Sequence, residues 1–309
     1  MGQYDVARDS SFLQDASIDY DKRKKIMWAT GLSAYAATST SLYFAWYRQF
    51  DQSAFHSFDD WGEWNQMDKS GHAYSAYIES HIFYGISRWA GYNEEKALKI
   101  GAASSILGQL SIEIMDGFSS QWGFSWSDMG SNLLGTSLFY FQQKHLGHQP
   151  IRLKMSYWPV SYDRTALTTV DGQVGGSLHN RSVSLFGRSG IERFLKDYNG
   201  QTIWLSAGLY HLFPERKIPR WLAISVGYSG QNLFGGRYNA WQEEGLNFVA
   251  GKSRSRQIIL ALDYDLSQIK TSNHHIQKIL NFMNIFKWPA PGVSYSTSEG
   301  LSFHVVFRN

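Results

Sequence analysis

Three stretches between Trp64 and Phe141 carry residue types that could do chemistry, spaced as on one face of a helix. Side chains three, four or seven positions apart share a helix face, so each stretch predicts a polar stripe on a mostly apolar helix. Because lone buried carboxylates are costly, the stripes are expected to bury against one another. The candidate polar cluster comprises Asp68, His72, Glu79, Gln109, Glu113, Asp116, Asp128 and Asn132. All but Glu79 and Gln109 are expected to converge in one buried or half-buried site.

Three interpretations of this cluster are open. A carboxylate and a histidine one turn apart can ligate a metal ion together, although the zinc-enzyme motif H-E-x-x-H does not occur. Alternatively, His72 oriented by a carboxylate could perform acid–base catalysis on a lipid or glycan phosphate. The favoured interpretation is a buried hydrogen-bond network that fixes how the helices pack. The candidate metal ligands are Asp68, His72, Glu113, Asp116 and Asp128. No catalytic residue is assigned, and no cofactor other than a divalent metal is considered.

The composition limits the function classes. With 309 residues the chain can form one large domain or two ordinary ones. It contains no cysteine, which excludes a disulfide framework, a thiolate zinc site, a cysteine nucleophile and a lipid-modified cysteine within this chain. The net charge of +3 is small and scattered, so nucleic acid is not an expected partner. Aromatic residues make up 16% of the chain, with 12 Trp and 18 Tyr, which favours contact with a membrane interface.

The helices that must position the stripes lie in the first half of the chain. A bundle of about four helices is expected over residues 21–148, after a mobile arm at residues 1–20. Residues 26–47 contain no charged side chain, and a helix of this length could span a bilayer. Their many Ser and Thr residues favour a buried or interfacial helix instead, with the preceding basic run at lipid headgroups. The three stripes fall on predicted helices over about 66–89, 93–116 and 125–141.

Beyond residue 145 the apolar period changes from about 3.6 to 2, which predicts strands with one apolar face. About six strands, mainly antiparallel, are expected within residues 149–309, with helices inserted near 189–197 and 273–286. Six strands are fewer than the smallest usual membrane barrel contains. We therefore expect an open sheet or partial barrel, covered by the helices or completed by further strands near 180–187. The predicted fold class is α+β, with a helical bundle packed on this sheet.

Short motifs in both halves of the chain occur in a known family. In the helical half they are Asp68-Lys69-Ser70-Gly71-His72, Glu113-Ile114-Met115-Asp116-Gly117-Phe118-Ser119 and Trp122-Gly123-Phe124-Ser125-Trp126-Ser127-Asp128, then Asn132 and Gly135. In the second half they are Lys196-Asp197-Tyr198-Asn199-Gly200-Gln201-Thr202, Pro219-Arg220-Trp221-Leu222 and Pro289-Ala290-Pro291. Through these motifs the chain resembles the YfiM-like family of uncharacterised bacterial envelope proteins, predicted to be periplasmic or at the outer membrane. It also looks distantly like the VanZ-like membrane proteins. The resemblance implies a Gram-negative envelope location and no particular reaction, and the lipid-anchoring cysteine of the short lipoprotein members is missing here.

Two functional classes follow from these observations. The favoured one is a non-enzymatic envelope protein, integral to or tightly associated with the outer membrane or its periplasmic face, and working as a subunit of a larger assembly. The alternative is a metal- or His-dependent hydrolase that acts on envelope lipid or glycan. The expected partners are membrane lipid and other outer-membrane proteins. No signal peptide is recognised in this chain, as expected for a trimmed secreted protein with an added Met and equally for a cytosolic one.

Overall fold

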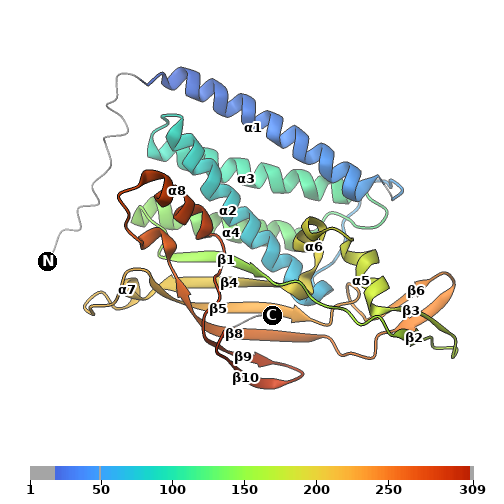
Figure 1. Cartoon of the computed structure of the whole chain (residues 1–309). Helices are drawn as coiled ribbons and strands as arrows, with labels where there is room; N and C mark the ends of the chain where they lie inside the picture. The colour runs from blue at the N-terminus through green and yellow to red at the C-terminus, as the bar shows by residue number, and fades with distance from the viewer. Residues whose placement is uncertain (1–17, 49, 307–309) are drawn as a thin grey trace.

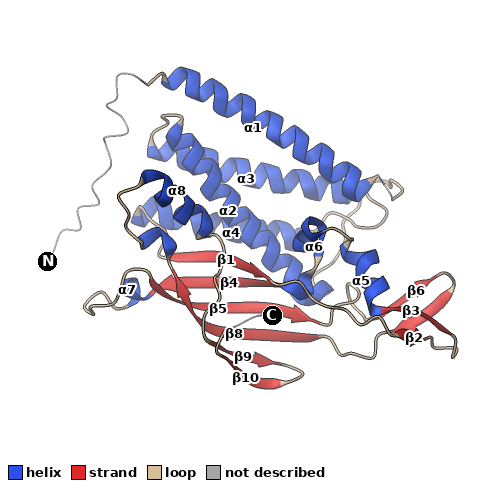
Figure 2. Cartoon of the chain, in the orientation of Figure 1, coloured by secondary structure: helices blue, strands red, loops and turns tan. Residues whose placement is uncertain are grey.

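The structure, a computed structural model, describes residues 18–48 and 50–306. The arm predicted at residues 1–20 lies almost entirely outside these residues. A layer of long helices lies against a twisted antiparallel sheet (Figure 1, Figure 2). The predicted α+β class is therefore confirmed, whereas the division into units at residues 21–148 and 149–309 stays a prediction.

The helical layer is built by four long helices of the described chain: α1 Tyr20–Leu42, α2 Met67–Trp89, α3 Glu94–Gly117 and α4 Trp126–Leu146. The side chains of Asn93 and Ser125 cap α3 and α4 by accepting the backbone N–H of Lys96 and Asp128. α4 continues past its predicted end at residue 141 and stops at Gly147, whose φ of 72° is the left-handed conformation typical of a helix C-terminus. The predicted helices thus exist and carry the stripes as expected.

Small residues let α2 approach α3 and α4 closely. A Cβ atom on Gly135 of α4 would lie 1.9 Å from the carbonyl oxygen of Ala73, and one on Gly101 of α3 would lie 2.7 Å from that of Ser80. Neither position could hold a larger side chain without moving a backbone. The close approach brings the polar stripes of the three helices within reach of one another.

α1 lies on the outer side of the helical layer, away from the sheet (Figure 1). Within the described helix α1, Met27 is the one buried side chain, and a short π-helical segment, Tyr43–Tyr47, continues the helix. Arg23 attaches it to the end of α2 by donating to the carbonyl oxygen of Trp89 at 3.2 Å. None of the helices in the described part of the chain, α1 included, has both the length and the apolarity needed to cross a membrane.

The second half of the chain forms a six-stranded antiparallel sheet in the order β1-β4-β5-β8-β9-β10. Its strands are β1 Ile151–Tyr157, β4 Gln201–Gly208, β5 Leu222–Gln231, β8 Ser255–Tyr264, β9 Gly292–Ser296 and β10 Gly300–His304. Two hairpins extend from it: β2 Ala166–Thr168 with β3 Val174–Ser177, and β6 Ala240–Glu243 with β7 Leu246–Val249. The inserted helices are α5 Leu178–Phe186, α6 Gly190–Lys196, α7 Leu209–Leu212 and α8 His274–Met283. The further strands considered near 180–187 are wrong, because that stretch is α5, capped by the Ser177 side chain.

The two faces of the sheet differ from those of a sheet in water. One cross-strand row consists of Met155, Ile203, Tyr228, Ile258, Tyr295 and Leu301. The first three belong to the core that packs against Met67 and Tyr74 of α2, whereas the last three are 56–63% exposed. On the opposite face, Ser229, Gln257 and Ser294 are at most 6% exposed and hydrogen bond to one another across β5, β8 and β9. Beyond the helices, the sheet therefore exposes apolar side chains and buries polar ones.

Candidate functional site

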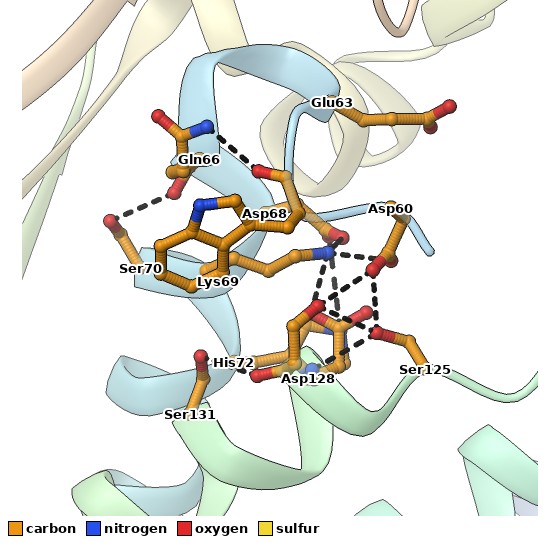
Figure 3. A network of polar contacts seen from close by, with 12 residues as sticks. Asp60, Glu63, Gln66, Asp68, Lys69, Ser70, His72, Ser125, Asp128 and Ser131 are labelled. Carbon is orange, nitrogen blue, oxygen red and sulfur yellow. Dashed lines mark hydrogen bonds and ion pairs between the residues drawn. The ribbon is translucent and has the colours of Figure 1, made fainter. Parts of the chain in front are cut away.

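The site begins at a strained turn in front of α2. Trp64, Asn65 and Gln66 have φ angles of 49°, 52° and 61°, a conformation that residues other than glycine rarely adopt. The sheet holds this turn, because Asn65 Nδ2 donates to the carbonyl oxygen of Ser255 at 3.1 Å and the Tyr228 hydroxyl donates to the carbonyl oxygen of Asn65. Such strain persists only where the surroundings determine it. The turn leads the chain from the preceding loop into the first turn of α2 (Figure 3).

Lys69 lies at the centre of the charged groups. Its Nζ atom is 2.5 Å from Asp60 Oδ2, 2.9 Å from Asp128 Oδ1 and 3.1 Å from Asp68 Oδ2 (Figure 3). The Lys69 side chain is only 5% exposed. A buried ammonium group needs compensating charge, and three carboxylates from the loop, α2 and α4 supply it.

His72, one turn further along α2, faces a second set of carboxylate oxygens. Its Nε2 atom lies 3.8 Å from each of Asp68 Oδ1, Glu113 Oε1 and Asp128 Oδ1. On the other side of the ring, Nδ1 lies 3.2 Å from Asn132 Oδ1, which fixes Nδ1 as the donor in this arrangement. Nε2 therefore points at three oxygens, each of them too distant for a hydrogen bond.

Hydroxyl groups complete the site from outside the three stripes. The Tyr198 hydroxyl, from a single 3₁₀ turn before β4, donates to Asp68 Oδ1 at 2.6 Å. Ser125 and Ser127 donate to Asp60 Oδ1 at 2.6 and 2.7 Å. The sheet half and the helical half thus both contribute to one polar network.

The structure places the eight predicted cluster residues in three groups. Asp68, His72, Glu113, Asp128 and Asn132 come together in the site just described. Gln109 Nε2 donates instead to Glu79 Oε1 at 2.9 Å, as a separate pair on α3 and α2. The Asp116 carboxylate accepts from the Tyr47 hydroxyl at 2.8 Å, so its hydrogen bond goes to the segment after α1 and not to the site.

Sequence reasoning left five members of the network out of the cluster: Asp60, Lys69, Ser125, Ser127 and Tyr198. Lys69 follows Asp68 directly and so lies off the helical stripe, but its long side chain reaches back to it. Asp60 lies in a loop, where no periodicity points to it. The cap motif of α4 was a usable signal for Ser125, since an N-cap hydroxyl can also contact a neighbouring acid.

Burial and mutual repulsion shift the pKa values of the site. Burial raises the pKa of Glu113 and of Asp128, and the negative charge of Asp68 adds to the effect at Asp128. Burial alone would lower the pKa of His72, but the carboxylates of Asp68, Asp128 and Glu113 together raise it to about 8. All three shifts favour uptake of positive charge, whether as protons or as a cation. Ligand atoms of Asp68, His72 and Asp128 lie within 4.8 Å of one another, which is close enough for one ion to reach all three.

Comparison with known proteins gives one match. Residues 30–144, which hold most of the helical layer and all of the site except Tyr198, match the family model described as Predicted periplasmic lipoprotein (DUF2279). The chain is thus similar to an uncharacterised periplasmic envelope family, and at this level the predicted resemblance is confirmed. No curated protein and no solved structure matches the chain. The match supports an association with the cell envelope and assigns no function.

Proposed function

We propose that this protein is a non-enzymatic envelope protein held tightly at the outer membrane by an apolar face of its sheet. The observation that carries this proposal is the polarity of the sheet: β5, β8, β9 and β10 expose apolar side chains, and β5, β8 and β9 bury polar ones. The family match supports an envelope location, and the finer YfiM-like and VanZ-like resemblances favour contact with a membrane. Membrane lipid is the proposed partner, and other outer-membrane proteins would join it in an assembly.

The exposed surface involved, here named the sheet patch, consists of Val226, Ile258, Leu260, Leu262, Tyr295, Leu301 and Phe303, each 43–79% exposed. An antiparallel sheet in water normally buries its apolar face and solvates its polar one. The reverse arrangement is favourable where hydrocarbon replaces water outside the sheet, because each large apolar side chain gains about 1.5–3 kcal/mol on full burial. A contiguous exposed patch of this kind is a typical interaction surface.

α1 offers a second surface of suitable chemistry. Trp28, Leu32 and Tyr35 are 46%, 65% and 49% exposed, and four basic residues, 22–25, lie in its first turns. Trp and Tyr favour the headgroup region of a membrane, and basic side chains favour anionic lipid. A helix of this composition is suited to lie along a membrane surface.

Vesicle flotation tests the sheet patch directly. The full chain should float with vesicles of phosphatidylethanolamine and phosphatidylglycerol, and the double variant Ile258→Ser/Leu260→Ser should remain at the bottom of the gradient. Both positions are exposed, so the change removes lipid contact with little effect on folding. Ile191→Ser on α6, an apolar side chain that is 76% exposed away from the patch, is the matched control and should float normally.

Cell fractionation tests the location. The protein should sediment with outer membranes, require detergent for extraction, and co-purify with other outer-membrane proteins. Release by a salt wash alone would contradict the proposal, because a salt wash disrupts charge contacts and leaves apolar ones in place.

One observation favours the alternative, a hydrolase of envelope lipid or glycan. His72 is held by Asn132 on one side and faces carboxylates on the other, the arrangement that acid–base catalysis requires. The side chains of His72 and Asp68 remain 17% and 21% accessible, so a small group could reach them. Turnover of an envelope lipid or glycan by the full chain, lost in His72→Gln, would support this function; flotation without turnover would support the first.

A further inference from the structure

The three oxygens around His72 Nε2 are arranged as ligands rather than as hydrogen-bond acceptors. They come from three different helical positions, on α2, α3 and α4, yet each lies at the same 3.8 Å from the nitrogen. A proton on Nε2 could not make a normal hydrogen bond to any of them at that distance. A group placed between the nitrogen and the oxygens of Asp68 and Asp128 could contact all three atoms, which lie within 4.8 Å of one another. Glu113 Oε1 lies 3.8 Å from the same nitrogen.

One buried oxygen at the same point lacks a hydrogen-bond partner. Glu113 is 1% exposed, and its Oε1 atom, which faces His72, accepts no hydrogen bond from any residue that the structure describes. The other carboxylate oxygen, Oε2, is satisfied by the backbone N–H of Ser125 at 3.1 Å. Asp128 Oδ1, by contrast, has the Lys69 ammonium group 2.9 Å away as its ion-pair partner. Buried polar atoms are rarely left as Glu113 Oε1 is without an unseen partner such as an ion.

The charge balance calls for a cation. The site holds four carboxylates, which are Asp60, Asp68, Glu113 and Asp128. With all four ionised, Lys69 the single positive group and a neutral imidazole, three negative charges remain. A divalent ion would reduce this excess to one. At Asp68, Lys69 contacts Oδ2 and leaves Oδ1, which His72 faces, for the ion. At Asp128, Lys69 and His72 face the same oxygen, Oδ1, so the ion would share that oxygen with the ammonium group.

The donor set indicates the class of ion. Bonds of about 2.1 Å to imidazole nitrogen and carboxylate oxygen in tetrahedral geometry put the donors about 3.4 Å apart. The nitrogen–oxygen distance of 3.8 Å needs a closure of a few tenths of an ångström, whereas the carboxylate oxygens of Asp68 and Asp128, which lie within 4.8 Å of one another, need a closure of up to about 1.4 Å. Imidazole suits first-row transition ions, whereas calcium and magnesium prefer oxygen alone. The contact of Nδ1 with Asn132 leaves the Nε2 lone pair free for the metal, as in known histidine–metal sites.

We propose that His72 Nε2 and the carboxylates of Asp68, Glu113 and Asp128 bind one divalent transition-metal ion of the Zn²⁺ or Mn²⁺ class. The ion would join α2, α3 and α4, so its binding would also stabilise the fold. This site is independent of the sheet patch, and lipid binding can fail without affecting it.

Calorimetric titration of the chelator-treated full chain with Zn²⁺ and Mn²⁺ tests this site. One ion per chain should bind, and the melting temperature should rise with metal concentration. Glu113→Gln, nearly the same shape, should weaken binding by about 100-fold or more, since even loss of an outer-shell contact costs about 10–100-fold. Asp116→Asn, which changes a half-buried carboxyl on the same helix that pairs with Tyr47, should bind as the unaltered chain does.

A measurement on the unaltered chain covers the case in which Glu113→Gln does not fold. Co²⁺ should give the visible absorption of a four- or five-coordinate nitrogen–oxygen site, and added Zn²⁺ should abolish it. Failure of Zn²⁺, Mn²⁺ and Co²⁺ to bind stoichiometrically would overturn the proposal and leave a protonated His72 as the partner of the three carboxylates. Equal Zn²⁺ affinity in the Glu113→Gln and Asp116→Asn variants would overturn it as well.

Discussion

Asn132 Oδ1 on α4 lies 3.2 Å from His72 Nδ1 on α2, and this contact sets the direction of the whole imidazole ring. Asn132 is completely buried, so the acceptor cannot be replaced by water without rearrangement. The Asn132 side-chain amide therefore orients the ring so that Nε2, and not Nδ1, faces Glu113 and the two aspartates.

Removing that amide should release the ring. In Asn132→Ala, His72 can turn about its side-chain bonds, and we expect Zn²⁺ affinity to fall by about 10–100-fold, the usual effect of losing the second contact of a ligating histidine. The variant should also lose about 1–3 kcal/mol of unfolding free energy, because the half-buried His72 Nδ1 donor is left without a partner. Ser131→Ala, the neighbouring position on α4 whose hydroxyl bonds only within its helix, should leave the affinity unchanged. Titration calorimetry and urea unfolding measure both effects.

The close contact of α2 and α4 predicts opposite effects at two glycines of one helix. Gly135→Ala would put a methyl group 1.9 Å from the carbonyl oxygen of Ala73, so the helices must move apart at a cost of about 1–3 kcal/mol or more. Gly130→Ala meets nothing within 4 Å and should stabilise the helix by about 0.5–1 kcal/mol. Thermal unfolding of the pair distinguishes a packing requirement from simple helix propensity. Equal effects at the two positions would contradict the close approach.

The helical half was predictable where periodicity alone determines structure. The stripes placed Asp68, His72, Glu113 and Asp128 on adjoining faces because lone buried carboxylates are costly. The apolar residues beside the stripes gave no such constraint, since Leu133 and Leu134 are 47% and 70% exposed. Lys69 and Tyr198 could not be found by that argument. Lys69 lies off the stripe, and only its long side chain brings the ammonium group to Asp68. Tyr198 lies in the other half of the chain and contacts Asp68 through tertiary packing.

The sheet half shows a different limit. The alternation of apolar and polar residues predicted the six strands of the sheet correctly. It cannot tell which face of a strand the protein buries, and here the polar side chains of Ser229 and Gln257 are buried. The stretch near 180–187 also alternates, yet it is a helix. The Ser177 side chain caps its start, and Leu178 and Phe186 bury in a small core with Tyr162 and Phe234. Such tertiary partners override local pattern.

Glu79 makes the stability of the protein depend on pH. Burial raises its pKa from 4.5 to about 7, although Gln109 donates to its carboxylate and the charge of His72 favours ionisation. A raised folded-state pKa means that the stabilising contribution is complete below pH 4.5 and is lost as pH rises to about 7. Glu79→Gln keeps the contact with Gln109 and removes the titration.

The Glu79→Gln variant should therefore match the unaltered chain near pH 4 and exceed its stability by about 1–3 kcal/mol at pH 8. Glu95→Gln on the exposed face of α3 is the control and should leave the pH dependence unchanged. Urea unfolding at a series of pH values provides the comparison. A constant difference between variant and unaltered chain at every pH would show that Glu79 does not titrate in this range.

The sheet face that buries Ser229 and Gln257, opposite the face packed on α2, also contains a buried ion pair, Lys154 with Asp263. Both side chains are fully buried, and Nζ lies 3.0 Å from Asp263 Oδ2. The Ser206 hydroxyl donates to the same oxygen at 2.5 Å, and Lys287 Nζ lies 4.0 Å from Oδ1. Asp263 is therefore the anion for two ammonium groups, and burial lowers the pKa of both lysines.

Asp263→Ala should destabilise the protein by about 3–5 kcal/mol, because it leaves Lys154 buried without its charge partner. Removing both members, as in Lys154→Met/Asp263→Leu, should cost less than Asp263→Ala alone, since Lys154 is then no longer a buried charge and only Lys287 is left without its carboxylate. Lys287 loses the same carboxylate in both variants, so its contribution does not change their difference. Its amino group can still donate to the carbonyl oxygen of Trp288 at 2.7 Å. Unfolding free energies of the two variants test this: a double variant less stable than Asp263→Ala would contradict the prediction, because it would mean that an unpaired Lys154 costs less than its replacement by Met.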